Sequence, residues 1–242
     1  MKVNHEIYTF RTNGVLSKIS LSSQNRSEVS IAALPSDPVG LSTAGKFIFV
    51  CDESGAVATH YTFLNDGTMV SAVDWNHIDE EYVWNEANRK MYFFRQADPT
   101  DLMTEHIFEN GTIGQRVDSY LNNNTGFEHP IRVDPSGQFA ILGSGIIHNA
   151  RTLKRLDVSL SNDVVDIAFT DNDVRTIRNT GNGAVQIQRW QLGSPFTLEK
   201  VLEVDGRAHS IHALDNNKTV VVTKNATGVP SIHVLNEEFV LV

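Results

Sequence analysis

The chain has 242 residues, of which 40% are hydrophobic and 8% aromatic, a composition that supports a packed core and excludes a disordered protein. Twenty Lys and Arg against 29 Asp and Glu give a net charge of −9, which disfavours nucleic acid and anionic membrane surfaces as partners. The single cysteine, Cys51, excludes an intrachain disulfide, and no apolar stretch reaches the length of a membrane helix. Cys51 lies in an apolar run, so we expect a small buried side chain there.

The first elements in chain order form an incomplete unit. Residues 5–11 predict a strand, Asn13-Gly14 a hairpin turn, and residues 15–21 and 29–34 two further strands. The strand that should precede them is missing, so the chain begins in the middle of this unit.

A recurring pattern follows, made of a short apolar strand, a four-residue polar turn and a more apolar strand. The turns occupy residues 42–45, 85–88, 134–137, 170–173 and 215–218 and are rich in Gly, Asn, Asp and Pro, which suit hairpin backbone angles. Successive turns are separated by between 36 and 49 residues. A period of this length built only from strands is typical of propeller blades.

Further strands follow most of these pairs. Third strands are predicted at residues 56–63, 103–108, 185–191 and 231–235, and fourth strands at residues 68–73, 112–117, 197–204 and 239–242. We therefore predict an all-β fold: a β-propeller of about six four-stranded blades, the first incomplete, in one domain spanning residues 1–242. A β-sandwich or another all-β repeat is the alternative. The inner-strand residues expected to be buried are Phe47, Phe49, Tyr92, Phe94, Phe139, Ile141, Ile177, Val220 and Val222.

One copy of the pattern resembles a known family. Residues 129–139, HPIRVDPSGQF, are similar to the blade signature of bacterial propellers of the YVTN, lactonase-like and quinoprotein-like (WD40-like) superfamily. The Trp-Asp ending and Gly-His opening of true WD40 blades are absent. The resemblance implies the propeller fold and does not by itself imply an activity.

Polar residues recur just before the first strands of the blades. Loops at this position gather at one mouth of a propeller's central channel, so side chains far apart in sequence can face one another there. Trp75, at the end of a blade, adds an aromatic ring that could stack on a sugar. The candidate binding residues are Asp37, Trp75, His77, His129, Asp163 and His209. Ordinary turn roles, or hydrogen bonds to the backbone of the next blade, are the alternative for these side chains.

Other suggestive residues are better explained by turns. Asp171 and Asp173 flank Asn172 but lack the further ligands of a calcium loop, and the glycines at 143–145 and 181–183 are not followed by a helix that could hold a phosphate. We predict no catalytic residue, metal site or cofactor.

Two functions remain open at this point. The first is a non-catalytic binding module for a protein, peptide or glycan, as a monomeric domain of a larger bacterial surface or envelope protein. The alternative is a lactonase-like or quinoprotein-like enzyme with its His and Asp site at the channel mouth.

The ends of the chain carry a further expectation. Residues 239–242 are assigned to the last blade, so closure of the first blade requires residues 1–4 or a segment preceding them. We favour a domain excised from a longer chain. Its location would be extracellular or periplasmic if that chain is secreted, and cytoplasmic otherwise.

Overall fold

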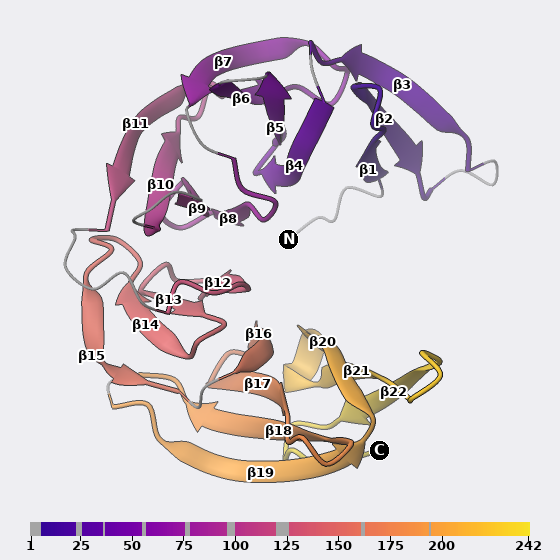
Figure 1. Cartoon of the computed structure of the whole chain (residues 1–242), viewed down its shortest axis with the longest axis vertical. Coiled ribbons are helices and arrows are strands. Elements are labelled where there is room, and N and C mark those ends of the chain that lie inside the picture. Colours follow the sequence, from indigo (N-terminus) through magenta and orange to yellow (C-terminus); the bar gives the residue numbers. More distant parts are fainter. Residues whose placement is uncertain are drawn as a thin grey trace. The chain divides into compact units, whose positions relative to one another are not determined.

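The structure is a computed structural model that describes residues 6–22, 26–35, 37–54, 57–75, 78–95, 100–119, 126–160, 163–193 and 195–242. Its fold is all-β, and the described strands form six antiparallel sheets of three or four strands each, as in the blades of a β-propeller (Figure 1). Helical geometry within these ranges is confined to the 3-10 turn Asp215–Asn217, and no described helix could cross a membrane. The chain divides into two compact units, called here the N-unit (Met1–Ser119) and the C-unit (Tyr120–Val242).

The N-unit contains three sheets. The first has three strands, β1 (Glu6–Phe10), β2 (Val15–Ser20) and β3 (Glu28–Ala33). The second has four, β4 (Asp37–Ala44), β5 (Phe47–Ser54), β6 (Val57–Phe63) and β7 (Met69–Trp75). The third comprises β8 (Val83–Asn85), β9 (Lys90–Arg95), β10 (Asp101–Ile107) and β11 (Ile113–Asp118).

The C-unit also contains three sheets. These are β12 (Ile131–Val133), β13 (Phe139–Leu142), β14 (Ile146–Asn149) and β15 (Arg155–Ser159), then β16 (Val164–Phe169), β17 (Asp173–Asn179), β18 (Ala184–Gln191) and β19 (Leu198–Asp205). The last has three strands, β20 (Arg207–Ala213), β21 (Thr219–Lys224) and β22 (Pro230–Leu235). In every sheet the strands pair in sequence order, so each blade forms from hairpins alone.

The turn of the family-like motif shows why the strands form where they do. The carboxylate of Asp134 accepts hydrogen bonds from the backbone amides of Ser136 (3.0 Å) and Gln138 (2.7 Å). Gly137 has φ 69°, a left-handed conformation that glycine adopts without steric cost. Asp and Gly at these two positions therefore close the hairpin between β12 and β13, as the sequence predicts.

The predicted core is confirmed for six of the nine side chains, whose exposure is 3% or less: Phe47, Phe49, Tyr92, Phe94, Ile141 and Ile177. Phe139, Val220 and Val222 are only half-buried. In β21 the fully buried residue is Val221, because alternate residues of a strand point to opposite faces. Three consecutive valines do not reveal which face meets the core, so the strand was predicted correctly and its inward face was not.

The last blade differs from the prediction. Residues 239–242 were expected to form a fourth strand, but only Leu241 pairs, through an isolated bridge to Leu235. The neighbouring Phe239 has φ 64° and closes a turn from Asn236, which prevents an extended strand there. Residues 1–4, invoked above for closure, lie outside the described residues.

Candidate functional site

The first strands of the three C-unit blades are aligned by one buried carboxylate. Asp166 in β16 forms an ion pair with Arg132 of β12 (Nη2 to Oδ1, 2.8 Å). Its other oxygen accepts a hydrogen bond from the amide of Ile211 in β20, at 3.0 Å. Asp166 is only 5% exposed, so its carboxylate is largely shielded from water, while the Arg132 side chain stays 33% exposed. Through these contacts Asp166 fixes the positions of the first strands β12, β16 and β20 along their length relative to one another.

Three of the predicted site residues lie at one end of these aligned strands. His129 lies three residues before Arg132, and Asp163 lies three residues before Asp166. His209 lies two residues before Ile211. All three side chains are exposed. The C-unit therefore places His129, Asp163 and His209 at the same end of neighbouring first strands.

Gly143, in the turn between β13 and β14, lies between the segments that carry His129 and Asp163. Its amide donates to the carbonyl of Glu128 and its carbonyl accepts from Val164, both at 2.8 Å. A Cβ atom added at Gly143 would lie 2.0 Å from the carbonyl oxygen of His129. Only a glycine permits this close approach, so the backbone around both candidates is tightly constrained.

A pocket of about 320 Å³ opens beside this turn. Its charged lining residues are Glu128, Arg155 and Asp163, and Ser144 adds a hydroxyl that donates to the carbonyl of Gly126 at 2.5 Å. Asp163 has φ 59°, a left-handed conformation that Asp tolerates better than most residues. The pocket can accept hydrogen bonds through two carboxylates and donate them through one guanidinium.

A second pocket of about 550 Å³ lies at the same end of the C-unit. It is lined by Gly183 from the β17–β18 turn, by Gly206 and Arg207 at the entry to β20, and by residues 224–226 and 228 of the β21–β22 turn. Its charged residues are Arg207 and Lys224, so unlike the first pocket it presents only positive charge. His209 lies two residues beyond Arg207, at a bulge in β20.

The N-unit holds the remaining candidates. Asp37 is the exposed first residue of β4, opposite Glu53 in β5. Trp75 ends β7 half-buried, and the guanidinium of Arg116 lies 4.3 Å from its ring centroid. His77 lies outside the described residues. Among the residues described, no three metal-binding side chains come together.

Sequence reasoning missed a buried polar network in the N-unit. His60 in β6 and Glu105 in β10 are both 0% exposed, and the histidine Nδ1 lies 2.7 Å from the Glu105 Oε2. Arg116 pairs with the other oxygen of Glu105, while His60 Nε2 contacts the Tyr82 hydroxyl at 3.1 Å. Burial raises the pKa of Tyr82 well above its usual value and that of the Cys51 thiol to about 12. These groups face the core and serve the packing of one blade against the next.

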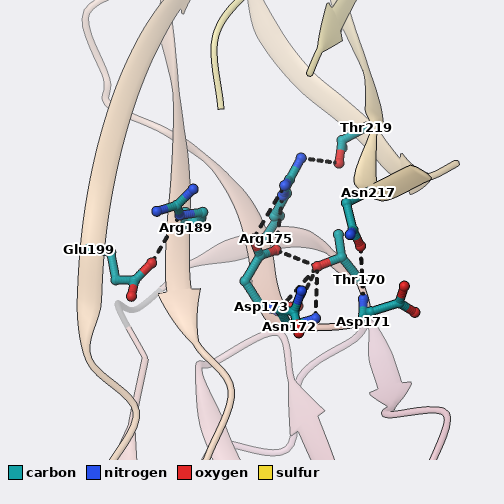
Figure 2. Close-up of polar contacts among 9 residues, drawn as sticks. All are labelled: Thr170, Asp171, Asn172, Asp173, Arg175, Arg189, Glu199, Asn217 and Thr219. Carbon is teal, nitrogen blue, oxygen red and sulfur yellow. Dashed lines mark hydrogen bonds and ion pairs between the residues drawn. The ribbon is translucent and has the colours of Figure 1, made fainter. Parts of the chain in front are cut away.

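The C-unit has a second network of this kind (Figure 2). Arg175 in β17 is 0% exposed, donates to both carboxylate oxygens of Asp173 (2.9 and 3.2 Å) and reaches Thr219 of β21 at 2.7 Å. Thr170 in turn donates to Asp173 at 2.8 Å. Asp173, considered above for a calcium loop, is thus the counter-ion of a buried arginine. No clear signal in the sequence marked this pair, because β17 carries other polar residues as well, Thr176, Arg178 and Asn179.

Comparison with known proteins supports the fold alone. No family model and no curated protein matches the chain. A solved structure of a functionally unknown protein from Desulfotomaculum acetoxidans matches with a TM-score of 0.68 and 14% identity, over 98% of this chain and 81% of that one. The Dos1 propeller matches at 0.67 and 8% identity, over 97% of this chain and 66% of that one. A putative 6-phosphogluconolactonase from Bacteroides fragilis matches at 0.61 and 13% identity, over 100% and 82%. The chain is therefore similar to propellers in fold.

Proposed function

We propose that the chain is a non-catalytic binding module of a larger bacterial surface or envelope protein, related to the YVTN, lactonase-like and quinoprotein-like propellers. The observation that carries this proposal is the shared end of the C-unit strands, where two pockets of about 320 and 550 Å³ open between short turns. Loops held by a rigid scaffold are the usual place for recognition, because the sheets fix their geometry at no cost on binding.

The proposed contact residues in the C-unit are His129, Asp163 and His209. Their exposure and common level favour contact with one extended ligand, either a peptide or a glycan. The left-handed backbone of Asp163 supports a functional role, since sparsely populated conformations concentrate at binding sites. Asp37, at the start of the first strand of its own blade, is the corresponding candidate in the N-unit.

Other histidines of the C-unit have contacts that explain them structurally. The His148 Nδ1–H donates to the carbonyl of Leu153 at 2.8 Å, and His233 Nε2 lies 3.1 Å from the Thr223 hydroxyl. These side chains support the blades. His129 and His209 are exposed at the strand ends instead, and this exposure favours recognition of a ligand there over acid–base chemistry.

A lactonase-like or quinoprotein-like enzyme is the second candidate. Glu128 and Asp163 line one pocket, and two carboxylates can divide the roles of general acid and general base. The similarity in fold to a putative lactonase points the same way, although 13% identity carries no activity across.

Peptide and glycan arrays probed with the intact protein test the proposal. We expect a saturable ligand whose binding is weakened by Asp163→Asn and by His129→Ala. Asp171→Asn is the matched control, because Asp171 is an exposed carboxylate of the same blade at the opposite end of β16. Turnover of lactone or ester substrates that disappears in Asp163→Asn, with no ligand on either array, would overturn the proposal in favour of the enzyme.

A further inference from the structure

Two cations face each other at the mouth of the larger C-unit pocket. Arg207 is the first residue of β20 and Lys224 the last of β21, and they are directly opposite in the register of the antiparallel pair. Side chains opposite each other in such a pair have Cβ atoms about 4.5–5.5 Å apart, so two like charges repel. The sheet would be more stable with either residue neutral, and both line the pocket.

Neither cation is neutralised within the described part of the chain. No hydrogen bond or ion pair joins the Arg207 guanidinium or the Lys224 ammonium to another described residue, whereas Arg189 of the preceding blade pairs with Glu199 at 3.0 Å. Asp205, the carboxylate nearest in sequence to Arg207, is not among the residues that line the pocket. In a chain with nine more acidic than basic residues, two adjacent cations without a counter-ion are unusual.

We propose that this pocket binds a carboxylate of an acidic peptide segment in a partner protein. The proposal rests on the binding function proposed above and names its ligand chemistry. The carboxylate would lie between the two cations, accept paired hydrogen bonds from the planar guanidinium of Arg207 and take a third from Lys224. Binding would remove the repulsion between Arg207 and Lys224.

The backbone of the pocket favours a carboxylate over a phosphate. Phosphate sites are commonly built from several free amides at a glycine-rich turn. Here the Gly206 amide donates to Gly183 (2.9 Å), that of Asn225 to Val229 (3.0 Å) and that of Gly228 to Asn225 (2.9 Å). With these three amides engaged, the Arg207 and Lys224 side chains supply the positive charge available to an anion, and two cationic side chains suit the two oxygens of a carboxylate.

The charge of the whole molecule favours a short acidic peptide over a polyanion. A net charge of −9 repels long anionic chains, while a local pair of cations can still attract one or two carboxylates within a Debye length of about 8 Å. Gly183 and Gly228 line the pocket, and a Cβ atom added at either would meet no other atom within 4 Å. This side of the pocket therefore leaves room for the backbone of a bound peptide.

Fluorescence anisotropy with a fluorescein-labelled hepta-glutamate peptide tests the proposal on the full chain. We expect Arg207→Ala and Lys224→Ala each to weaken binding roughly tenfold, because each removes a charge-assisted hydrogen bond. Arg207→Lys should retain part of the affinity. Lys218→Ala should leave it unchanged, since Lys218 is an exposed cation next to the opposite end of β21. Asp205→Asn should strengthen binding, a gain that structural damage could not produce.

Two outcomes would overturn the inference. In the first, Arg207→Ala and Lys224→Ala leave the affinity for the peptide unchanged. The peptide would then bind at another site, and the chain would still be a binding module. The other is displacement of the peptide by inorganic phosphate at far lower concentration than by acetate, which would identify a phosphate site. Absence of every ligand on the arrays, with lactone turnover, would instead refute the binding function itself.

Discussion

The buried network around Glu105 provides the sharpest test of how the N-unit is held together. The change is Glu105→Gln, which keeps the shape of the side chain and removes its charge. In the structure this carboxylate is 0% exposed and lies between the His60 ring and the Arg116 guanidinium. The substituted amide would direct an N–H group at a partner that itself donates a hydrogen bond, and the half-buried guanidinium of Arg116 would lose its counter-ion.

The expected cost follows from that geometry. Removing one partner of a buried ion pair typically lowers the free energy of unfolding by about 3–5 kcal/mol. We expect the lower end of this range because the Arg116 side chain is 21% exposed. For a unit of this size the thermal midpoint should fall by roughly 10 °C. Glu199→Gln is the control, because Glu199 pairs with Arg189 on the surface at 39% exposure and such pairs contribute about 0–1 kcal/mol.

Urea unfolding followed by tryptophan fluorescence measures the difference. Trp75 lies beneath the Arg116 guanidinium and 6.4 Å from the His60 ring, so its emission reports on the network directly. In a double-mutant cycle with His60→Phe and Glu105→Leu, the double variant should lose less free energy of unfolding than the sum of the losses in the two single variants. Equal shifts for Glu105→Gln and Glu199→Gln would refute the reasoning.

Three further outcomes are expected from the same structure. Arg175→Met should destabilise the C-unit by about 3–5 kcal/mol in urea unfolding, because it leaves the carboxylate of Asp173 buried without its cation, and adding Asp173→Ala should recover part of the loss. Gly67→Ala should lower the thermal midpoint far more than Gly181→Ala: both glycines have positive φ, but a Cβ at Gly67 would lie 1.8 Å from the Ile31 carbonyl oxygen, while one at Gly181 meets nothing within 4 Å. Burial lowers the pKa of His148 below its usual 6.5, so the unfolded chain takes up a proton before the folded one does and stability should fall as pH decreases from about 7 through that range. His148→Gln should flatten this slope of unfolding free energy against pH, and an unchanged slope would contradict the assignment.

The strands could be predicted because hairpin chemistry is local. Turns such as Asp134–Gly137 contain the residues whose side chains and backbone angles close them, so their sequence specifies both flanking strands. The glycines at 143–145 mark the turn into β14, but the turn from β14 into β15 carried no comparable signal. The connection between β14 and β15 contains Leu153 at φ 58°, and leucine is a residue type that does not predict a left-handed turn.

The buried networks could not be predicted, because their partners are distant in sequence. His60 and Glu105 are 45 residues apart, and Arg175 and Thr219 are 44 apart. A polar residue within an apolar strand looks the same whether it faces solvent or a neighbouring blade. Only the packing of one sheet on the next decides which, and packing is a property of the folded chain.

The candidate site depends on the same kind of contact, and this joins the fold to the proposed function. Asp166 contacts both β12 and β20 and so fixes how far each first strand extends relative to the next. It therefore also positions His129, Asp163 and His209, which lie at the ends of these strands. No hydrogen bond of an antiparallel sheet could do this, because the three strands belong to different sheets. A ligand that touches several blades needs that alignment before it arrives, since otherwise ordering the loops would oppose binding. A buried carboxylate that contacts no ligand thus acts as a positioning residue for the loops that would.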